Sequence, residues 1–545
     1  MQDKIYKIME ELVALKSVSC THEEYKAGEW LADYFKKIPY FKKHPELTGL
    51  APLPGDIYGR GVAWALVLGN SPKTIISSGH YDVVGTDNYG PLKDFAYEIG
   101  DDLDADLALQ NLDSEARADM ESGDWIWGRG VADMKGGHAV HIALLEENVK
   151  LAEEGKLPGC HMYVAVPDEE SFSAGMREGA KLIRELVKKY NLDIRMMIIP
   201  EPSNLSGVAQ SMSLGTVGKM MPVVMVQGVT AHVGKCFNGL SPMSIMNGIY
   251  ARTEKALEFC DSFDGEVTSP PTWQRYRDMK ELYDVTIPLR TSGYFTLLCF
   301  ERTPDEVIGR LKEISREALD EAARDVKAKY EEFKNMGATV EKEEIKYEPE
   351  VYTYAELSAK LAERDGEKFE AFRSELYDKI TRKVEGGELN FPDATIEIME
   401  KVMDYADLKQ PAVLLAFAPP FYPPVNSDLI EGHENTATKA YEVVKKEAEK
   451  LGRKTYSEHY FMGISDGSYC AMGKKFDYAI FKENTPTYGR LYDLDFETIA
   501  ENSIPFVLYG PVSKEYHQWT ERVERKSLLE ELPQVTRKLM DFLWS

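Results

Sequence analysis

The sequence predicts an α/β fold: a mixed, mostly parallel sheet flanked by helices, with an α+β domain inserted into it. Residues 1–213 alternate helical periodicity with short, near-continuous apolar runs, which are typical of strands buried on both faces. This pattern stops after residue 213 and resumes after residue 424. A chain of 545 residues is also too long for a single hydrophobic core.

The first part of the chain opens with two helical patterns. Apolar side chains recur at helical spacing over residues 5–15 and again over 30–35. Apolar runs of strand length follow, and a helix that begins after Gly136-Gly137 lies among them. The runs predict strands at 62–68, 73–84, 161–168 and 195–203, and the helix is predicted over 138–151.

The middle part begins with a strand-like run at 217–229. A helix is predicted from Ser241-Pro242, because serine is a favoured N-cap and proline fits the first helical position. After a strand at 293–301, Thr303 and Glu306 form a capping box that starts a second helix with an apolar stripe.

The remaining segments complete the predicted architecture. Residues 325–410 are charged and helical in character, which indicates an insertion, and an apolar run follows at 412–418. The last part again shows α/β patterns: a helix at 436–452, strands at 476–481 and 505–510, and a helix after Val523. We therefore divide the chain into a main domain in two parts, 1–213 and 425–545, and an inserted domain, 214–424.

The composition excludes several classes of partner. The formal net charge of −26 disfavours nucleic acid and anionic membranes, because both would repel the protein. Six scattered cysteines without a CxxC pair predict a reducing compartment and no disulfide framework. The N-terminus indicates an amphipathic helix and not a signal peptide, and no window has the roughly 20 apolar residues of a membrane span. We therefore expect a cytoplasmic protein. The acidic segment 90–124 is interpreted as a solvated insertion.

Polar, ionisable side chains stand at the ends of the predicted strands. In an α/β sheet, ligands bind beyond the carboxyl ends of the strands. Imidazole with carboxylate is the ligand mix of zinc or a similar divalent ion in a hydrolytic site, and more than four ligands suggest two metals. The candidates are His80, Asp82, Asp133, Asp168, Glu169, Glu170, Glu201 and His517.

Each piece also has an ordinary structural interpretation. The pair His80 and Asp82 can simply satisfy a strand terminus, adjacent acids are common on solvated surfaces, and Asp133 can cap the helix that follows it. His138 and His141, one turn apart, are interpreted as helix-face residues because no motif places them at a strand end. The ordered combination at strand ends favours a functional site.

The motifs SSGHYDVV, GRGVADMKGG, PDEES and IPEPSN and the late His517 together resemble the co-catalytic zinc peptidase/deacylase family. This family contains acetylornithine deacetylase, succinyl-diaminopimelate desuccinylase, aminoacylase and glutamate-releasing carboxypeptidases. The length of the chain and Gly85, where the family usually has proline, are more similar to its arginine-utilisation (RocB-type) branch. The resemblance implies that the split domain is catalytic and that the inserted domain is its lid and dimerisation domain.

The resemblance also implies a role for each site residue. His80 and Glu201 bind one metal ion, Glu170 and His517 bind the second, and Asp133 bridges both. Glu169 matches the general base and Asp82 its supporting carboxylate. A cis peptide is implied at Asp133-Met134. His232, in VQGVTAHVGKCFNGLSP, and Asp466, in GISDGS, match substrate contacts, and in dimeric members the histidine reaches the partner's site, so the resemblance alone implies a homodimer.

The resulting hypothesis is a hydrolase that cleaves an amide bond in a small N-acyl amino acid or short peptide. Its hydroxide would bridge two divalent ions, zinc first with cobalt or manganese as alternatives. Arginine- or ornithine-derived amides are the first substrates to consider. Two alternatives stay open: a non-catalytic binding or regulatory protein on the same scaffold, and an esterase using the same site. A Ser-His-Asp hydrolase is disfavoured because no GxSxG follows a strand.

Overall fold

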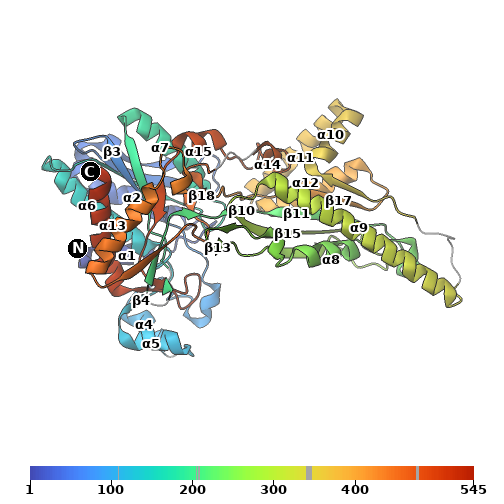
Figure 1. Cartoon of the computed structure of the whole chain (residues 1–545), viewed down its shortest axis with the longest axis horizontal. Helices are drawn as coiled ribbons and strands as arrows, with labels where there is room; N and C mark the ends of the chain where they lie inside the picture. The colour runs from blue at the N-terminus through green and yellow to red at the C-terminus, as the bar shows by residue number, and fades with distance from the viewer. Residues whose placement is uncertain (109, 204, 207–208, 339–345, 474–477) are drawn as a thin grey trace. The chain divides into compact units, whose positions relative to one another are not determined.

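The computed structural model describes residues 1–545 except 109, 204, 207–208, 339–345 and 474–477, and the described chain forms two compact units (Figure 1). The chain enters unit 2 twice. Unit 1 contains Met1–Val217, Pro423–Lys474 and Asp495–Ser545, and unit 2 contains Gly218–Tyr422 and Lys475–Leu494.

Among the described residues, unit 1 contains a nine-stranded sheet of order β1-β2-β5-β3-β6-β20-β8-β19, with β7 paired to β8. The central pairs β5–β3, β3–β6 and β6–β20 are parallel, whereas β1–β2 and β2–β5 are antiparallel. This confirms the predicted mixed, mostly parallel sheet. The strands are β1 (Thr48–Pro52), β2 (Gly61–Val67), β3 (Lys73–His80), β5 (Cys160–Val166), β6 (Asp193–Ile199), β7 (Leu205–Ser206), β8 (Ala209–Ser213), β19 (Lys454–Glu458) and β20 (Phe506–Leu508).

Helices cover both faces of this sheet. Phe35 of α2 and His138 of α6 both contact Tyr163 of β5, so these two helices share a face. Gly179 of α7 packs near Val166, whose side chain points to the opposite face. The helices of unit 1 are α1 (Gln2–Val13), α2 (Tyr25–Lys37), α3 (Pro39–Lys43), α4 (Asp101–Ala108), α5 (Ser114–Ser122), α6 (Lys135–Glu153), α7 (Ala174–Tyr190), α13 (Thr436–Lys450), α15 (Phe496–Asn502) and α16 (Leu532–Trp544).

Small sheets complete unit 1. A three-stranded sheet of order β21-β22-β4 joins β21 (Ser513–Lys514), β22 (Arg522–Glu524) and β4 (Trp125–Trp127). Its antiparallel pair β21–β22 forms a hairpin around residues 515–521. A two-stranded sheet pairs β9 (Gly215–Thr216) with β18 (Val425–Asn426).

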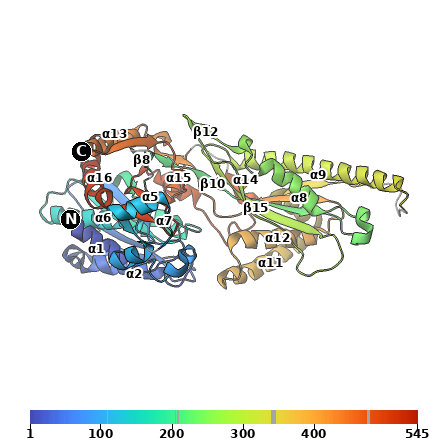
Figure 2. The same ribbon diagram turned by 90° about the horizontal axis from the view of Figure 1, so that it is seen from below.

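Unit 2 has a six-stranded sheet among its described residues, of order β10-β15-β11-β17-β16, with β14 paired to β15. Helices α8 and α9 lie on one side of the sheet, and α11 and α12 on the other (Figure 2). Its strands are β10 (Gly218–Met220), β11 (Pro222–Gln227), β14 (Thr272–Asp278), β15 (Arg290–Cys299), β16 (Glu350–Thr353) and β17 (Ala412–Phe417), beside the short pair β12 (Ser262–Phe263) and β13 (Glu266–Val267).

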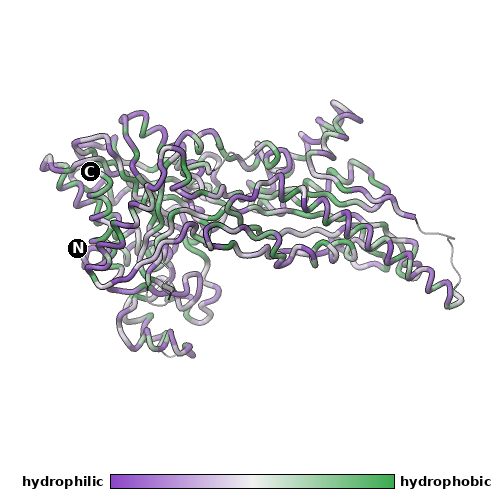
Figure 3. Tube along the Cα trace, in the orientation of Figure 1, coloured by the Kyte–Doolittle hydropathy of each residue, from purple (hydrophilic) through white to green (hydrophobic). Residues whose placement is uncertain are grey.

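The helices of unit 2 account for the predicted insertion. Val223 and Met225 of β11 point to the same face and pack against the helices that follow β16. Hydrophobic residues concentrate in the inner strands, and the outer helices carry more hydrophilic residues (Figure 3). The helices are α8 (Pro242–Thr253), α9 (Pro304–Asn335), α10 (Tyr354–Asp365), α11 (Glu367–Glu385), α12 (Phe391–Ala406) and α14 (Tyr478–Glu483).

The capping box that starts α9 is confirmed, because the Thr303 hydroxyl accepts from the Glu306 N–H and the Glu306 carboxylate from the Thr303 N–H. The predicted insertion 325–410 begins inside α9, and its residues 339–345 lie outside the described residues.

The strand predicted at 476–481 is wrong. Its first two residues lie outside the described part of the chain, and the rest begin helix α14. A short apolar run does not distinguish a buried strand from a buried helix turn. The sequence pattern also groups 475–494 with the main domain, but the structure places this segment in unit 2, where Phe481 packs on Phe417 and Phe421.

None of the helices that the structure describes combines the length and apolarity that a membrane crossing requires. The six cysteines all lie among the described residues, and all are free.

Close packing between α6 and the end of β6 gives a stability prediction. A Cβ at Gly137 would lie 2.5 Å from the Pro200 Cβ, whereas a Cβ at Gly179 in α7 would meet nothing closer than 3.4 Å. Gly137→Ala is expected to lower the free energy of unfolding by about 1–3 kcal/mol, because the helix must move. Gly179→Ala should leave it unchanged or raise it slightly, since alanine favours helix. Urea denaturation measures both, and equal effects would contradict this packing.

A buried histidine gives a pH prediction. The ring of His161 lies between Ser77 Oγ at 2.9 Å and Asn148 Nδ2 at 2.8 Å. Burial, and then the charge of Arg537, lowers the pKa of His161 to about 3. A histidine in the unfolded chain has a pKa of about 6.5. The neutral, buried His161 ring therefore contributes fully to stability above that pH, and the contribution is lost as the pH falls toward 3, because the unfolded chain binds the proton first. His161→Gln should reduce the slope of stability against pH by about 1.4 kcal/mol per unit between pH 6 and 4. Urea midpoints across this range measure the slope, and unchanged slopes would refute the assignment.

Candidate metal centre

Most of the candidate ligands lie at one edge of the large sheet of unit 1, where the carboxyl ends of three strands meet. His80 is the last residue of β3, Asp168–Glu170 follow β5, and Glu201 follows β6. These three strands run parallel, so their carboxyl ends meet at the same edge. Asp133 and His517 come from turns, the first just before α6 and the second in the β21–β22 hairpin.

The five predicted ligands lie in two groups that share one residue. His80, Asp133 and Glu201 form the first group, and Asp133, Glu170 and His517 form the second. Within each group the ligand atoms lie within 4.8 Å of one another. The arrangement can hold two cations, one in each group.

Asp133 joins the two groups through its separate carboxylate oxygens. Its Oδ1 lies 3.0 Å from His80 Nε2, and its Oδ2 lies 3.1 Å from His517 Nε2. The same His517 nitrogen lies 3.1 Å from Glu170 Oε1. The Asp133–Met134 peptide is cis, as the resemblance implies. A carboxylate that directs one oxygen to each group has the geometry of a bridging ligand.

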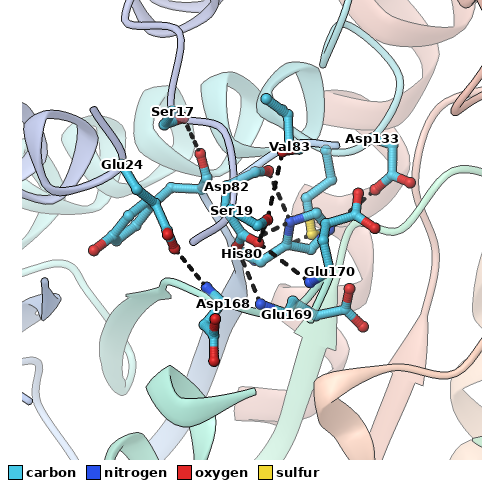
Figure 4. A network of polar contacts seen from close by, with 12 residues as sticks. Ser17, Ser19, Glu24, His80, Asp82, Val83, Asp133, Asp168, Glu169 and Glu170 are labelled. Atoms are coloured by element: carbon cyan, nitrogen blue, oxygen red, sulfur yellow. Dashed lines mark hydrogen bonds and ion pairs between the residues drawn. The ribbon is translucent and has the colours of Figure 1, made fainter. Parts of the chain in front are cut away.

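Asp82 supports two parts of the centre (Figure 4). His80 Nδ1 lies 3.1 Å from the Asp82 carbonyl oxygen and 3.6 Å from its Oδ1. The Asp82 carboxylate accepts from the backbone N–H groups of Glu169 and Glu170, both at 3.2 Å, and from the Ser19 hydroxyl at 2.5 Å. It therefore fixes the loop after β5 as well as the imidazole beside it.

A buried ion network that sequence reasoning missed holds the start of that loop. Arg60 Nη1 donates to Glu24 Oε2 at 2.9 Å and to Asp168 Oδ1 at 2.7 Å, and all three side chains are buried. Glu24 also accepts from the Asp168 N–H at 2.8 Å. Asp168 has a φ of +72°, a region that non-glycine residues rarely adopt. Only the first acid of the PDEES motif signals this network, because Arg60 and Glu24 stand in no motif.

The carboxylates of the centre repel one another. Burial raises the pKa of Glu201 well above its ordinary value, and the charge of Asp133 adds to the rise. Burial also raises the pKa of Glu169, and the negative charges of Asp466 and Glu201 add to the rise. Burial alone would lower the pKa of His517, but its hydrogen bonds to Asp133 and Glu170 raise it to about 10. So many close acids favour a bound positive charge, and a nitrogen and oxygen donor set without thiolate suits zinc, cobalt or manganese.

The other predicted residues are placed as follows. Asp466 is buried at the start of a short helix in unit 1, and burial with the charge of Asp82 raises its pKa to about 7. His232 is exposed in unit 2, where its Nδ1 accepts from the Gly234 N–H at 3.0 Å, and its role stays a prediction. His138 and His141 are buried in α6 and belong to neither ligand group in the described chain. His138 instead has its Nε2 2.9 Å from the carbonyl oxygen of His80.

The model of Peptidase family M20/M25/M40 matches residues 77–544, a range that contains every ligand described above. The chain belongs to peptidase family M20/M25/M40. Membership confirms the resemblance predicted from the motifs, and it makes the chain a relative of peptidases and deacylases.

Two proteins of Bacillus subtilis match this chain almost from end to end. "Uncharacterized protein YqjN" of Bacillus subtilis is 30% identical over 98% of this chain and 95% of its own length. Protein RocB of the same organism is 28% identical over 97% of this chain and 93% of its own. A succinyl-diaminopimelate desuccinylase of Stutzerimonas stutzeri is 30% identical over only 38% of this chain and 47% of its own. The full-length matches confirm the likeness to the RocB-type branch.

Solved structures support the fold. Aminopeptidase PepT from Bacillus cereus superposes with a TM-score of 0.53 at 14% identity, over 100% of this chain and 99% of its own. An M20 metallo-carboxypeptidase from Sulfolobus solfataricus gives 0.50 at 13% identity, over 100% of both chains. At these identities the likeness shows the M20 fold alone.

Proposed function

We propose that this M20 family protein is a dinuclear metal-dependent hydrolase that cleaves the amide bond of an N-acyl amino acid or a short peptide. The observation that carries the proposal is the pair of ligand groups that share Asp133. A structural zinc site would use thiolates, whereas a catalytic site also needs an acid that can transfer a proton. Glu169 stands next to the ligand Glu170 in the sequence but belongs to neither ligand group of the described chain.

His80, Asp133 and Glu201 would hold one ion, and Asp133, Glu170 and His517 the other. Zinc suits this donor set best, and cobalt or manganese are alternatives. When bound, two such ions supply Lewis acidity, which makes a water molecule more acidic and polarises a carbonyl group.

The protein supplies the proton transfer and the orientation. A carboxylate oxygen of Glu169 takes a proton from the attacking water and returns it to the leaving amine. Asp82 holds the His80 ring in place and, through the backbone of Glu169 and Glu170, keeps the base beside the ligands.

Substrate recognition is proposed for two further residues. His232 would donate a hydrogen bond to the oxyanion, in a homodimer from the partner copy, and Asp466 would line the substrate side of the centre. Likeness to RocB makes arginine- and ornithine-derived amides the first candidates in a cytoplasmic setting. A screen of N-acyl amino acids, dipeptides and matched esters with the metal-loaded protein would separate an amidase from an esterase.

The rival function is a binding or regulatory protein that keeps the scaffold without the chemistry. Glu169 speaks against it, since a binder has no use for a base that is not a ligand. The metal content of the purified protein distinguishes the hydrolase from the binding protein.

Metal stoichiometry is the first test of this function. The purified protein should bind two equivalents of zinc, cobalt or manganese per chain, measured by elemental analysis after dialysis. His517→Ala should retain about one equivalent, since the first group is intact, and Asp133→Ala should lose both because its side chain is shared. A wild-type protein without metal would support the binder, and two equivalents in His517→Ala would refute the ligand assignment.

The base gives a second test. Glu169→Gln should keep both equivalents of metal but lose about 10²–10⁴-fold in kcat on any amide that the wild type cleaves. Glu23→Gln, which alters a surface carboxylate paired with Lys26, is the matched control and should keep full turnover. Undiminished kcat in Glu169→Gln would remove Glu169 from the mechanism.

A further inference from the structure

Two buried residues outside the ligand set connect the turns that carry Asp133 and His517. We propose that Arg129 and Glu521 form a positioning pair that fixes the second ligand group, in which His517 meets Asp133 and Glu170. Neither residue belongs to a ligand group of the described chain. The inference rests on the proposed two-metal function.

The Glu521 carboxylate organises the turn that carries Asp133. Its Oε1 accepts from the backbone N–H groups of Gly130 at 2.8 Å, Ala132 at 3.2 Å and Asp133 at 3.3 Å. Only 1% of Glu521 is exposed, so these bonds are shielded from competing water. A carboxylate that accepts three N–H groups fixes the backbone path of residues 130–133 and therefore the direction of the Asp133 side chain.

The Arg129 guanidinium connects this carboxylate to the other turn. Its Nη1 donates to Glu521 Oε2 at 2.5 Å, and its Nη2 donates to the carbonyl oxygen of His517 at 3.2 Å. Arg129 is also only 1% exposed. The planar guanidinium holds both acceptors in fixed directions, which a lysine ammonium does not do. One ion pair thus links the backbones of two ligand turns.

The His517 turn needs this restraint. His517 has a φ of +66°, a left-handed backbone conformation that is unfavourable for a residue with a Cβ. His80 and Glu201 adjoin paired strands of the large sheet, but His517 lies in a hairpin turn with its side chain 42% exposed. A loosened turn therefore affects the second ligand group far more than the first.

The acidic segment 90–124, together with Asn88 just before it, also restrains the hairpin that carries His517. Asn88 Nδ2 donates to the His517 carbonyl oxygen at 2.8 Å. Asp119 of α5 accepts from Lys514 at 2.7 Å and from Arg522 Nε at 2.8 Å, one residue on each strand of the hairpin. The segment interpreted as a solvated insertion thus contacts the hairpin that carries His517.

Zinc titration of the metal-free protein tests the positioning pair without any substrate. The wild type should bind two equivalents, followed by calorimetry against a competing chelator. Arg129→Gln should weaken the zinc affinity of the second ligand group by about 10–100-fold, as expected when a residue that orients a ligand is removed. The zinc affinity of the first ligand group should change by less than about threefold. Arg129→Lys keeps the charge without the planar fork and should give an intermediate loss.

Arg184→Gln is the matched control. Arg184 is partly buried in α7 of unit 1 and contacts Glu501 and Thr498, neither of which belongs to a ligand turn, so its loss should lower the Tm without changing either zinc affinity. Two unchanged affinities in Arg129→Gln would overturn the positioning role, whatever its Tm. If Arg129→Gln does not fold, Arg129→Lys decides by the same criterion. Absence of zinc binding in the wild type would instead refute the proposed function itself.

Discussion

The crowding of buried acids around Asp133 is the constraint on which the rest of the site depends. Asp133, Glu170 and Glu201 converge on the same small volume, and burial raises the pKa of both glutamates. Such a cluster costs several kcal/mol for each charge removed from water unless positive charge compensates it. The two histidines offer part of that compensation, and bound cations would supply the remainder.

The fold meets this constraint in two different ways. His80 ends a paired strand of the large sheet and Glu201 follows another, so the sheet itself positions two of the three ligands of the first group. The turns that hold Asp133 and His517 lack such pairing at the ligands and are fixed by side chains, chiefly the ion pair of Arg129 and Glu521. A buried charge pair of this kind gains directional precision at little net gain in stability.

The sequence predicted the parts of the site that depend on local pattern. Strand ends can be recognised from apolar runs, which is why His80, Glu169, Glu170 and Glu201 could be placed at one sheet edge before the structure was known. The supporting partners could not be found in this way. Arg60 lies 108 residues from Asp168, and Arg129 lies 392 residues from Glu521, so only the tertiary fold pairs them.

The fold could be predicted from the sequence to a similar extent, and the prediction failed in one segment for a related reason. Residues 475–494 belong to unit 2 and not to the main domain. Contacts such as that of Phe481 with Phe421 stabilise this arrangement, and no local sequence pattern reveals them. The inserted helices α10–α12 cover one face of the sheet in unit 2, and the segment around Asp119 supports the hairpin of unit 1. In this chain, therefore, one insertion buries a face of the sheet in unit 2 and the other fixes a turn of unit 1.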